Sequence, residues 1–61
     1  MITYEQAQRL NDSELEAKQR ASAAALRQLD RSSPTYRGER TGLERAIRIL
    51  ARVTRERGMR R

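Results

Sequence analysis

The second half of the chain carries an arginine-rich helical pattern with three different faces. On a helical wheel at ~100° per residue, its apolar stripe consists of Tyr36, Leu43, Ile47 and Leu50, with Thr54 at its end. A second face collects small and apolar residues, and a third collects arginines. A surface helix of a folded domain needs only one apolar face and one polar face. We therefore expect the additional face to bind a partner.

The length of the chain limits how it can be stabilised. A chain of 61 residues forms one small domain at most, and such a domain buries only ~60% of its unfolded surface. Small scaffolds usually rely on disulfides, a metal or oligomerisation. The chain has no Cys and no His, so disulfides are impossible and neither a metal site nor a cofactor is expected. We predict a single domain over residues 1–61 that assembles into a homo-oligomer.

Capping signals predict two helices in the first half of the chain. In a capping box, a capping side chain and a residue three positions later each bond the other's backbone. Two such pairs occur, Thr3 with Gln6 and Ser13 with Glu16. They predict a short helix over residues 4–10 and a longer helix over residues 13–30.

A third helix is predicted over residues 34–57. Ser33 is a favourable N-cap, and Pro34 suits the first helical position. Gly58 is expected to end the helix, and residues 58–61 form a short basic tail.

The start of this helix has an alternative. Thr41 with Glu44 forms a third capping-box pattern, which would leave residues 34–40 as a loop. One continuous helix is preferred because it places Tyr36 on the apolar stripe.

The short connection at residues 31–33 predicts that the two long helices pack antiparallel. The apolar stripe of the earlier helix consists of Leu15, Ser22, Leu26 and Leu29. The numbering then pairs Leu29 with Tyr36, Ser22 with Leu43, and Leu15 with Leu50. A core this thin does not comfortably offset the ordering entropy of the chain. The predicted fold is therefore all-α, an antiparallel helical hairpin with a short N-terminal helix, assembling into a homo-oligomeric helical bundle.

The small-residue face is predicted to form the oligomer interface. A glycine inside a helix lowers helix stability by ~1 kcal/mol relative to alanine. Two glycines on one side of the helix therefore suggest that another backbone comes close there. Small residues at positions i and i+4 allow such a close approach. The predicted interface residues are Gly38, Gly42, Ala46, Ile49 and Val53, together with Ala17 and Ala21 of the preceding helix, where Ala24 and Ala25 are also small. The alternative is that the two glycines only mark a frayed helix start.

Charge is distributed unevenly along the chain. The net charge is +6, and residues 31–61 hold ten arginines against three acids, whereas residues 1–30 are close to neutral. The basic face of the last helix contains Arg37, Arg48, Arg52 and Arg55, with Arg45 and Thr41 at its edge. Arginine binds phosphate through two parallel hydrogen bonds and stacks on flat rings, so an anionic partner is indicated. A solvated face with local ion pairs, or an arginine excess from a GC-rich genome, remains an alternative.

The residue types that usually carry out catalysis are scarce. General acid–base and triad chemistry usually need His or Cys, and the glycines lack the lysine and the strand of a phosphate-binding loop. We expect a protein that is not an enzyme. No apolar run approaches the ~20 residues of a membrane span, and the N-terminus does not resemble a secretory signal. The expected location is the cytoplasm, without a membrane partner.

The run from Tyr36 to Arg48 resembles small phage and prophage helical-hairpin proteins. It is also similar to the last helix of phage anti-CBASS cyclic-nucleotide sponges, short oligomeric helical proteins that sequester signalling nucleotides from host defence. The shared elements are the Arg40-Thr41 pair, Leu43, and an arginine one or two turns later, and this region lacks the tryptophan and methionine of the family. The resemblance implies that Tyr36 stacks on a base, with Arg37, Arg40 and Thr41 near phosphate, in a host cell's cytoplasm.

These patterns predict a non-enzymatic, oligomeric binding protein of phage or mobile-element origin that engages an anionic ligand or a host protein. Three more specific alternatives remain open: a cyclic-nucleotide sponge, a nucleic-acid-binding accessory protein, and an inhibitor or adaptor that docks on a host protein.

Overall fold

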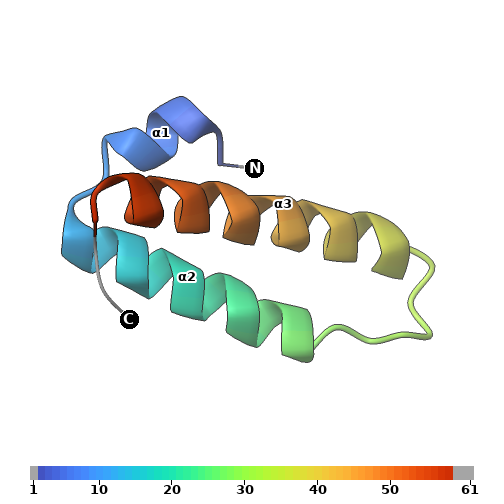
Figure 1. The fold of residues 1–61 in the computed structure, drawn as a ribbon. Coiled ribbons are helices and arrows are strands. Elements are labelled where there is room, and N and C mark those ends of the chain that lie inside the picture. Colours follow the sequence, from blue (N-terminus) through green and yellow to red (C-terminus); the bar gives the residue numbers. More distant parts are fainter. Residues whose placement is uncertain (1, 59–61) are drawn as a thin grey trace.

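The computed structural model describes residues 2–58, and these form three helices (Figure 1): α1 (Tyr4–Gln8), α2 (Asp12–Arg27) and α3 (Tyr36–Glu56). The two long helices, α2 and α3, run antiparallel and form one layer. Helix α1 packs on α3 near the C-terminal end of that helix. The all-α hairpin with a short N-terminal helix is thereby confirmed, and assembly with further copies stays a prediction.

The first helix begins as predicted. The Thr3 hydroxyl accepts a hydrogen bond from the Gln6 backbone N–H at 3.2 Å, and the Gln6 side chain accepts one from the Thr3 N–H at 3.0 Å. The helix ends at Gln8 rather than at residue 10.

The predicted capping box of the second helix is wrong. Asn11, not Ser13, is the N-cap, and its Oδ1 accepts from the Glu14 N–H at 2.8 Å while Glu14 Oε1 accepts from the Asn11 N–H at 2.9 Å. Asn caps helices as well as Ser does, and the earlier start places Asp12 in the first turn, where the helix dipole favours a negative charge. Glu16 pairs instead with Arg20, one turn later, at 3.1 Å.

The connection between the long helices is longer than the predicted three residues and spans residues 28–35. Asp30 Oδ1 accepts from both the N–H (2.9 Å) and the hydroxyl (2.6 Å) of Ser32, and the Ser33 N–H donates to the Asp30 carbonyl at 3.0 Å. Short polar side chains that bond nearby backbone compete with helix formation in this way. The connection therefore begins at residue 28 and takes in residues that were expected to be helical.

The third helix is continuous, so the alternative start at Thr41 is wrong. The predicted capping by Ser33 is also wrong, because Thr35 is the N-cap and makes no side-chain capping bond. The Ser33 hydroxyl instead accepts from the Thr35 N–H at 3.3 Å, which leaves Pro34 in the turn. At the other end Gly58 adopts φ +71°, the left-handed conformation expected of the residue that follows a helix. The rest of the predicted basic tail lies outside the described residues.

The core lies at the α1 end of the molecule. Its buried residues come from all three helices: Ala7, Leu15, Leu50 and Val53. Half-buried apolar side chains pack around them, namely Ile2, Tyr4, Leu10 and Ile49. The predicted neighbours Leu15 and Leu50 belong to this cluster. The core therefore depends on α1, which covers the end of the two-helix layer.

Two polar contacts close this end of the molecule. Thr54 is buried, and its hydroxyl donates to the Leu50 carbonyl at 2.8 Å while it accepts from the Gln19 amide at 3.1 Å. Arg57 donates to Asp12 Oδ1 at 3.0 Å and to the Gln8 carbonyl at 2.8 Å. Arg57 thus joins the end of α3 to the junction between α1 and α2.

Candidate anion-binding site at the connection between the long helices

A pocket of about 520 Å³ lies where the chain passes from α2 to α3. This volume is within the range of small-molecule sites, ~300–1,000 Å³. Its walls come from the last turn of α2, the connection and the first turns of α3: Leu26, Arg27, Arg31, Tyr36, Arg40 and Glu44. The pocket thus combines three guanidinium groups, one phenol ring and one carboxylate.

The arginines of the pocket differ in how they are paired. Arg40 Nε donates to Glu44 Oε2 at 3.2 Å, and this bond, together with the nearby Tyr36 hydroxyl, raises the pKa of Arg40. Arg27 and Arg31 make no ion pair within residues 2–58. Two cationic groups of the pocket are therefore available to an anion.

The position of Arg31 follows from the turn that contains it. Its neighbours Asp30 and Ser32 are joined by the two hydrogen bonds described above, and this bonding lowers the pKa of the Asp30 carboxyl. The Asp30 carboxylate is thus engaged by Ser32, and Arg31 projects from a hydrogen-bonded turn into the pocket lining.

Of the predicted ligand residues, only Tyr36 and Arg40 line this pocket. Another group, Arg37, Thr41, Arg48 and Arg55, is exposed along the outer side of α3, with Arg45 beside it. On an ideal helix these side chains lie ~60–140° around the axis from Arg40. The predicted ligand residues are therefore divided between a pocket and an exposed ridge.

Arg52 is held at the opposite end of the molecule. Its guanidinium lies over the Tyr4 ring, 4.6 Å from the centroid, and its Nε donates to Glu56 Oε2 at 3.2 Å. The Tyr4 hydroxyl donates a hydrogen bond to the other Glu56 oxygen. Arg52 thus takes part in the contact that fixes α1 to α3 and lies away from Tyr36 and Arg40.

Two residues of the pocket, Arg27 and Arg31, were not predicted. Arg27 directly follows Leu26, a member of the predicted apolar stripe, so an antiparallel hairpin brings Arg27 to the edge of the helix interface. This signal was present in the sequence. The position of Arg31 in the pocket could not be predicted, because the connection was expected to begin at Arg31, immediately after a helix ending at Asp30.

The predicted interface residues fall in different environments. Ala17, Ala21 and Gly38 are exposed, and a Cβ placed on Gly38 would meet nothing within 4 Å. Val53 is only 2% exposed, and Ile49 packs against the same core, so both are covered within one chain. The remaining two, Gly42 and Ala46, line a groove between α2 and α3.

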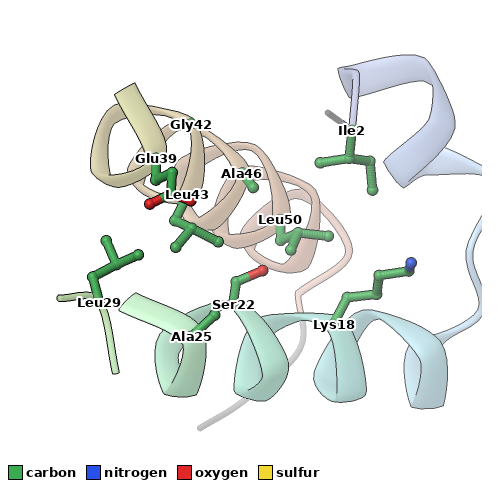
Figure 2. A pocket seen from close by; sticks show the side chains of 10 residues that line it. All are labelled: Ile2, Lys18, Ser22, Ala25, Leu29, Glu39, Gly42, Leu43, Ala46 and Leu50. Carbon is green, nitrogen blue, oxygen red and sulfur yellow. The ribbon is translucent and has the colours of Figure 1, made fainter. Parts of the chain in front are cut away.

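This groove is open to solvent, has a volume of about 530 Å³ and is largely apolar (Figure 2). Its full lining is Ile2, Lys18, Ser22, Ala25, Leu29, Glu39, Gly42, Leu43, Ala46 and Leu50. The predicted neighbours Ser22 and Leu43 both belong to it. The predicted pair Leu29 and Tyr36 is separated, since Leu29 lines the groove whereas Tyr36 lines the pocket with Leu26.

The fold and these surfaces define a small helical hairpin with a cationic pocket and an apolar groove. Comparison of the chain with protein-family models, with curated proteins and with solved structures finds no match. Within residues 2–58 no helix is long and apolar enough to cross a membrane, and no cluster of three or more acidic side chains forms a metal site.

Proposed function

We propose that the protein is a non-enzymatic binding protein whose ligand is a small anion with a flat ring, of the nucleotide class. The observation that carries this proposal is the meeting of Arg27 and Arg31, which make no ion pair in residues 2–58, with the Tyr36 ring in one pocket. Two guanidinium groups beside an aromatic ring match the two parts of a nucleotide, its phosphate and its base.

Each wall of the pocket has a distinct role in this proposal. Arg27 and Arg31 donate paired hydrogen bonds to phosphate oxygens, and the Tyr36 ring stacks on the base. Glu44 keeps Arg40 in a fixed position and repels ligands that bring negative charge to that side. The aligned peptide dipoles of α3 add a favourable field for an anion at its first turn, where the Thr35 side chain makes no capping bond.

A cyclic-nucleotide sponge, which the resemblance at Tyr36–Arg48 implies, is one form of this function. A sponge needs only binding and no chemical step, and the pocket offers cations and a ring. A phage or mobile-element origin belongs to the same proposal.

The test is isothermal titration calorimetry of the full chain with adenosine monophosphate, a cyclic dinucleotide and ribose 5-phosphate, which lacks the base. We expect the two nucleotides to bind and ribose 5-phosphate to bind more weakly. Replacing Arg27 or Arg31 by Gln removes a charged hydrogen bond worth ~1.5–3 kcal/mol, so affinity falls roughly 10- to 100-fold.

Two further variants make this test specific. Tyr36→Leu removes stacking worth ~1–3 kcal/mol, whereas Tyr36→Phe keeps the ring and most of the affinity. Arg20→Gln is the matched control, since Arg20 is exposed on α2 outside the pocket. The proposal fails if no nucleotide binds, or if Arg20→Gln weakens binding as much as Arg27→Gln does.

The exposed ridge favours a second candidate, binding of nucleic acid without sequence preference. Arg37, Arg45, Arg48 and Arg55 make no ion pair within the described chain, and at 1.5 Å per residue the ridge spans ~27 Å. Phosphate contacts along it predict an affinity that falls steeply with salt. Fluorescence anisotropy with single-stranded DNA at several salt concentrations separates this candidate from pocket binding, because Arg48→Gln lowers the salt slope and leaves nucleotide binding unchanged.

A further inference from the structure

The apolar groove is the part of the two-helix layer that α1 leaves open. Helix α1 covers Val53 and Ile49 at one end, and Ile2 marks the boundary between this covered end and the groove (Figure 2). Leu29 and Leu43, near the other end, remain half-buried. A domain is normally built from two packed layers that share one core, and over the groove the second layer is missing.

We propose that the groove binds the same groove of a second copy of the chain, giving a two-fold symmetric four-helix dimer. The Cα atoms span 38 × 21 × 14 Å, so the chain is elongated, and away from α1 it is one helix layer thick (Figure 1). Its accessible surface of 4892 Å² exceeds the ~4,100 Å² of a compact monomer of this mass. The open groove is part of that excess, and a second copy laid on it supplies the missing layer.

Charge explains why the occupant is another copy. The chain carries +6 overall, so two copies repel each other over most of their surface. The groove is an exception, because its lining contains one cation, Lys18, and one anion, Glu39. A strongly acidic partner finds no excess of positive charge there, whereas a second basic chain meets a surface that is neutral.

The two charges are also placed for a self-complementary interface. Lys18 and Glu39 lie toward opposite ends of the groove (Figure 2), and neither makes an ion pair within residues 2–58. A two-fold axis across the groove brings the Lys18 end of one copy to the Glu39 end of the other, twice. Between these ends the small residues Ser22, Gly42 and Ala46 let the two helix layers approach closely.

This dimer is independent of the anion-binding pocket. The pocket is lined by Leu26 and Tyr36, neither of which lines the groove. Failure of one proposal therefore leaves the other to be judged on its own test.

The experiment is sedimentation equilibrium of the full chain at low salt, with native mass spectrometry to count subunits. We expect a dimer for the natural sequence. Lys18→Glu and Glu39→Lys each replace two attractive contacts by two repulsive ones, so each weakens the dimer roughly ten-fold or more. An equimolar mixture of the two variants restores both pairs, and we expect it to form a heterodimer with the original affinity.

The matched control is Arg20→Glu, which changes the net charge as Lys18→Glu does but lies outside the groove lining. Circular dichroism confirms that each variant is folded. A chain that stays monomeric at millimolar concentration overturns the proposal. So does an Arg20→Glu variant that dissociates as readily as Lys18→Glu, or a mixture that fails to recover the dimer.

Discussion

Truncation of Leu15 tests whether the core lies at the α1 end of the molecule. Leu15 has no exposed surface and packs in the cluster with Ala7, Leu50 and Val53. Leu15→Ala removes three carbon atoms, worth ~0.8 kcal/mol each in transfer free energy, and leaves a cavity that adds to the loss. We expect the free energy of unfolding to fall by ~3 kcal/mol, within the range known for such changes. A folded chain of this length has only ~3–9 kcal/mol in total, so the variant is close to unfolding.

The assay is urea denaturation followed by far-ultraviolet circular dichroism, at one fixed protein concentration because self-association would shift the midpoint. With an m value near ~1 kcal/mol per molar urea, the midpoint falls by ~3 M. The control is Leu26→Ala on the same helix, which is half-buried and is expected to lose ~1 kcal/mol. If Leu15→Ala lowers the midpoint no more than Leu26→Ala does, the core has been placed at the wrong end.

Two further predictions concern helix ends and glycines, and both are read from thermal unfolding. Asn11→Ala breaks the capping box of α2 and lowers stability by ~1 kcal/mol, whereas Ser13→Ala, inside the helix, leaves it nearly unchanged. A larger loss of stability for Ser13→Ala than for Asn11→Ala would show that Ser13 is the N-cap. Gly58→Ala strains a backbone with φ +71° and destabilises by ~1 kcal/mol, whereas Gly38→Ala stabilises by up to ~1 kcal/mol, since its Cβ meets nothing. A loss of stability on Gly38→Ala would show that another backbone covers this residue.

Helical periodicity and end signals were sufficient to predict three helices, and boundaries were the weak point. The box at Thr3 and the stop at Gly58 were predicted correctly because each depends on residues within one turn. The box at Ser13 was predicted wrongly because Asn11 with Glu14 competes with it two residues earlier, and both pairs satisfy the same pattern. The earlier start also places Asp12 in the first turn of α2, where it accepts a hydrogen bond from Arg57.

The contribution of α1 could not be predicted from the wheel. A single wheel shows Ile49 and Val53 on a face that the hairpin partner does not reach, and another copy was the natural explanation. The structure supplies a covering element from the same chain, through Ile2, Tyr4 and Leu10. A five-residue helix has too few positions for a periodic pattern, so its packing face is not visible in the sequence.

The pocket was only half predictable for a related reason. Tyr36 and Arg40 lie within two turns of one helix, so their proximity follows from periodicity. Arg27 and Arg31 reach the pocket through the path of the connection. That path depends on the hydrogen bonds of Asp30 and Ser32, which displaced the expected helix end.

The contact between α1 and α3 makes a prediction about pH. The Tyr4 hydroxyl bonds Glu56, and this bond lowers the pKa of the Glu56 carboxyl and raises the pKa of the Tyr4 phenol. A lowered carboxyl pKa gives stability that is present above the ordinary carboxyl value and is lost as the pH falls through the lowered value. A raised phenol pKa gives stability that is present below ~10 and is lost as the pH rises through the raised value.

Thermal unfolding measured from pH 2 to pH 11 should therefore show a plateau with a loss of stability at each end. The chain has no His and no Cys, so no side chain normally titrates between about pH 5 and 9. Tyr4→Phe keeps the ring beneath Arg52 but removes the hydroxyl, so we expect a smaller loss at both ends than in the natural sequence. If Tyr4→Phe leaves the stability losses at both low and high pH unchanged, the bond to Glu56 does not hold α1 in place, and α1 is held by its other contacts, namely apolar packing, Arg52 over the ring and Arg57 on the Gln8 carbonyl.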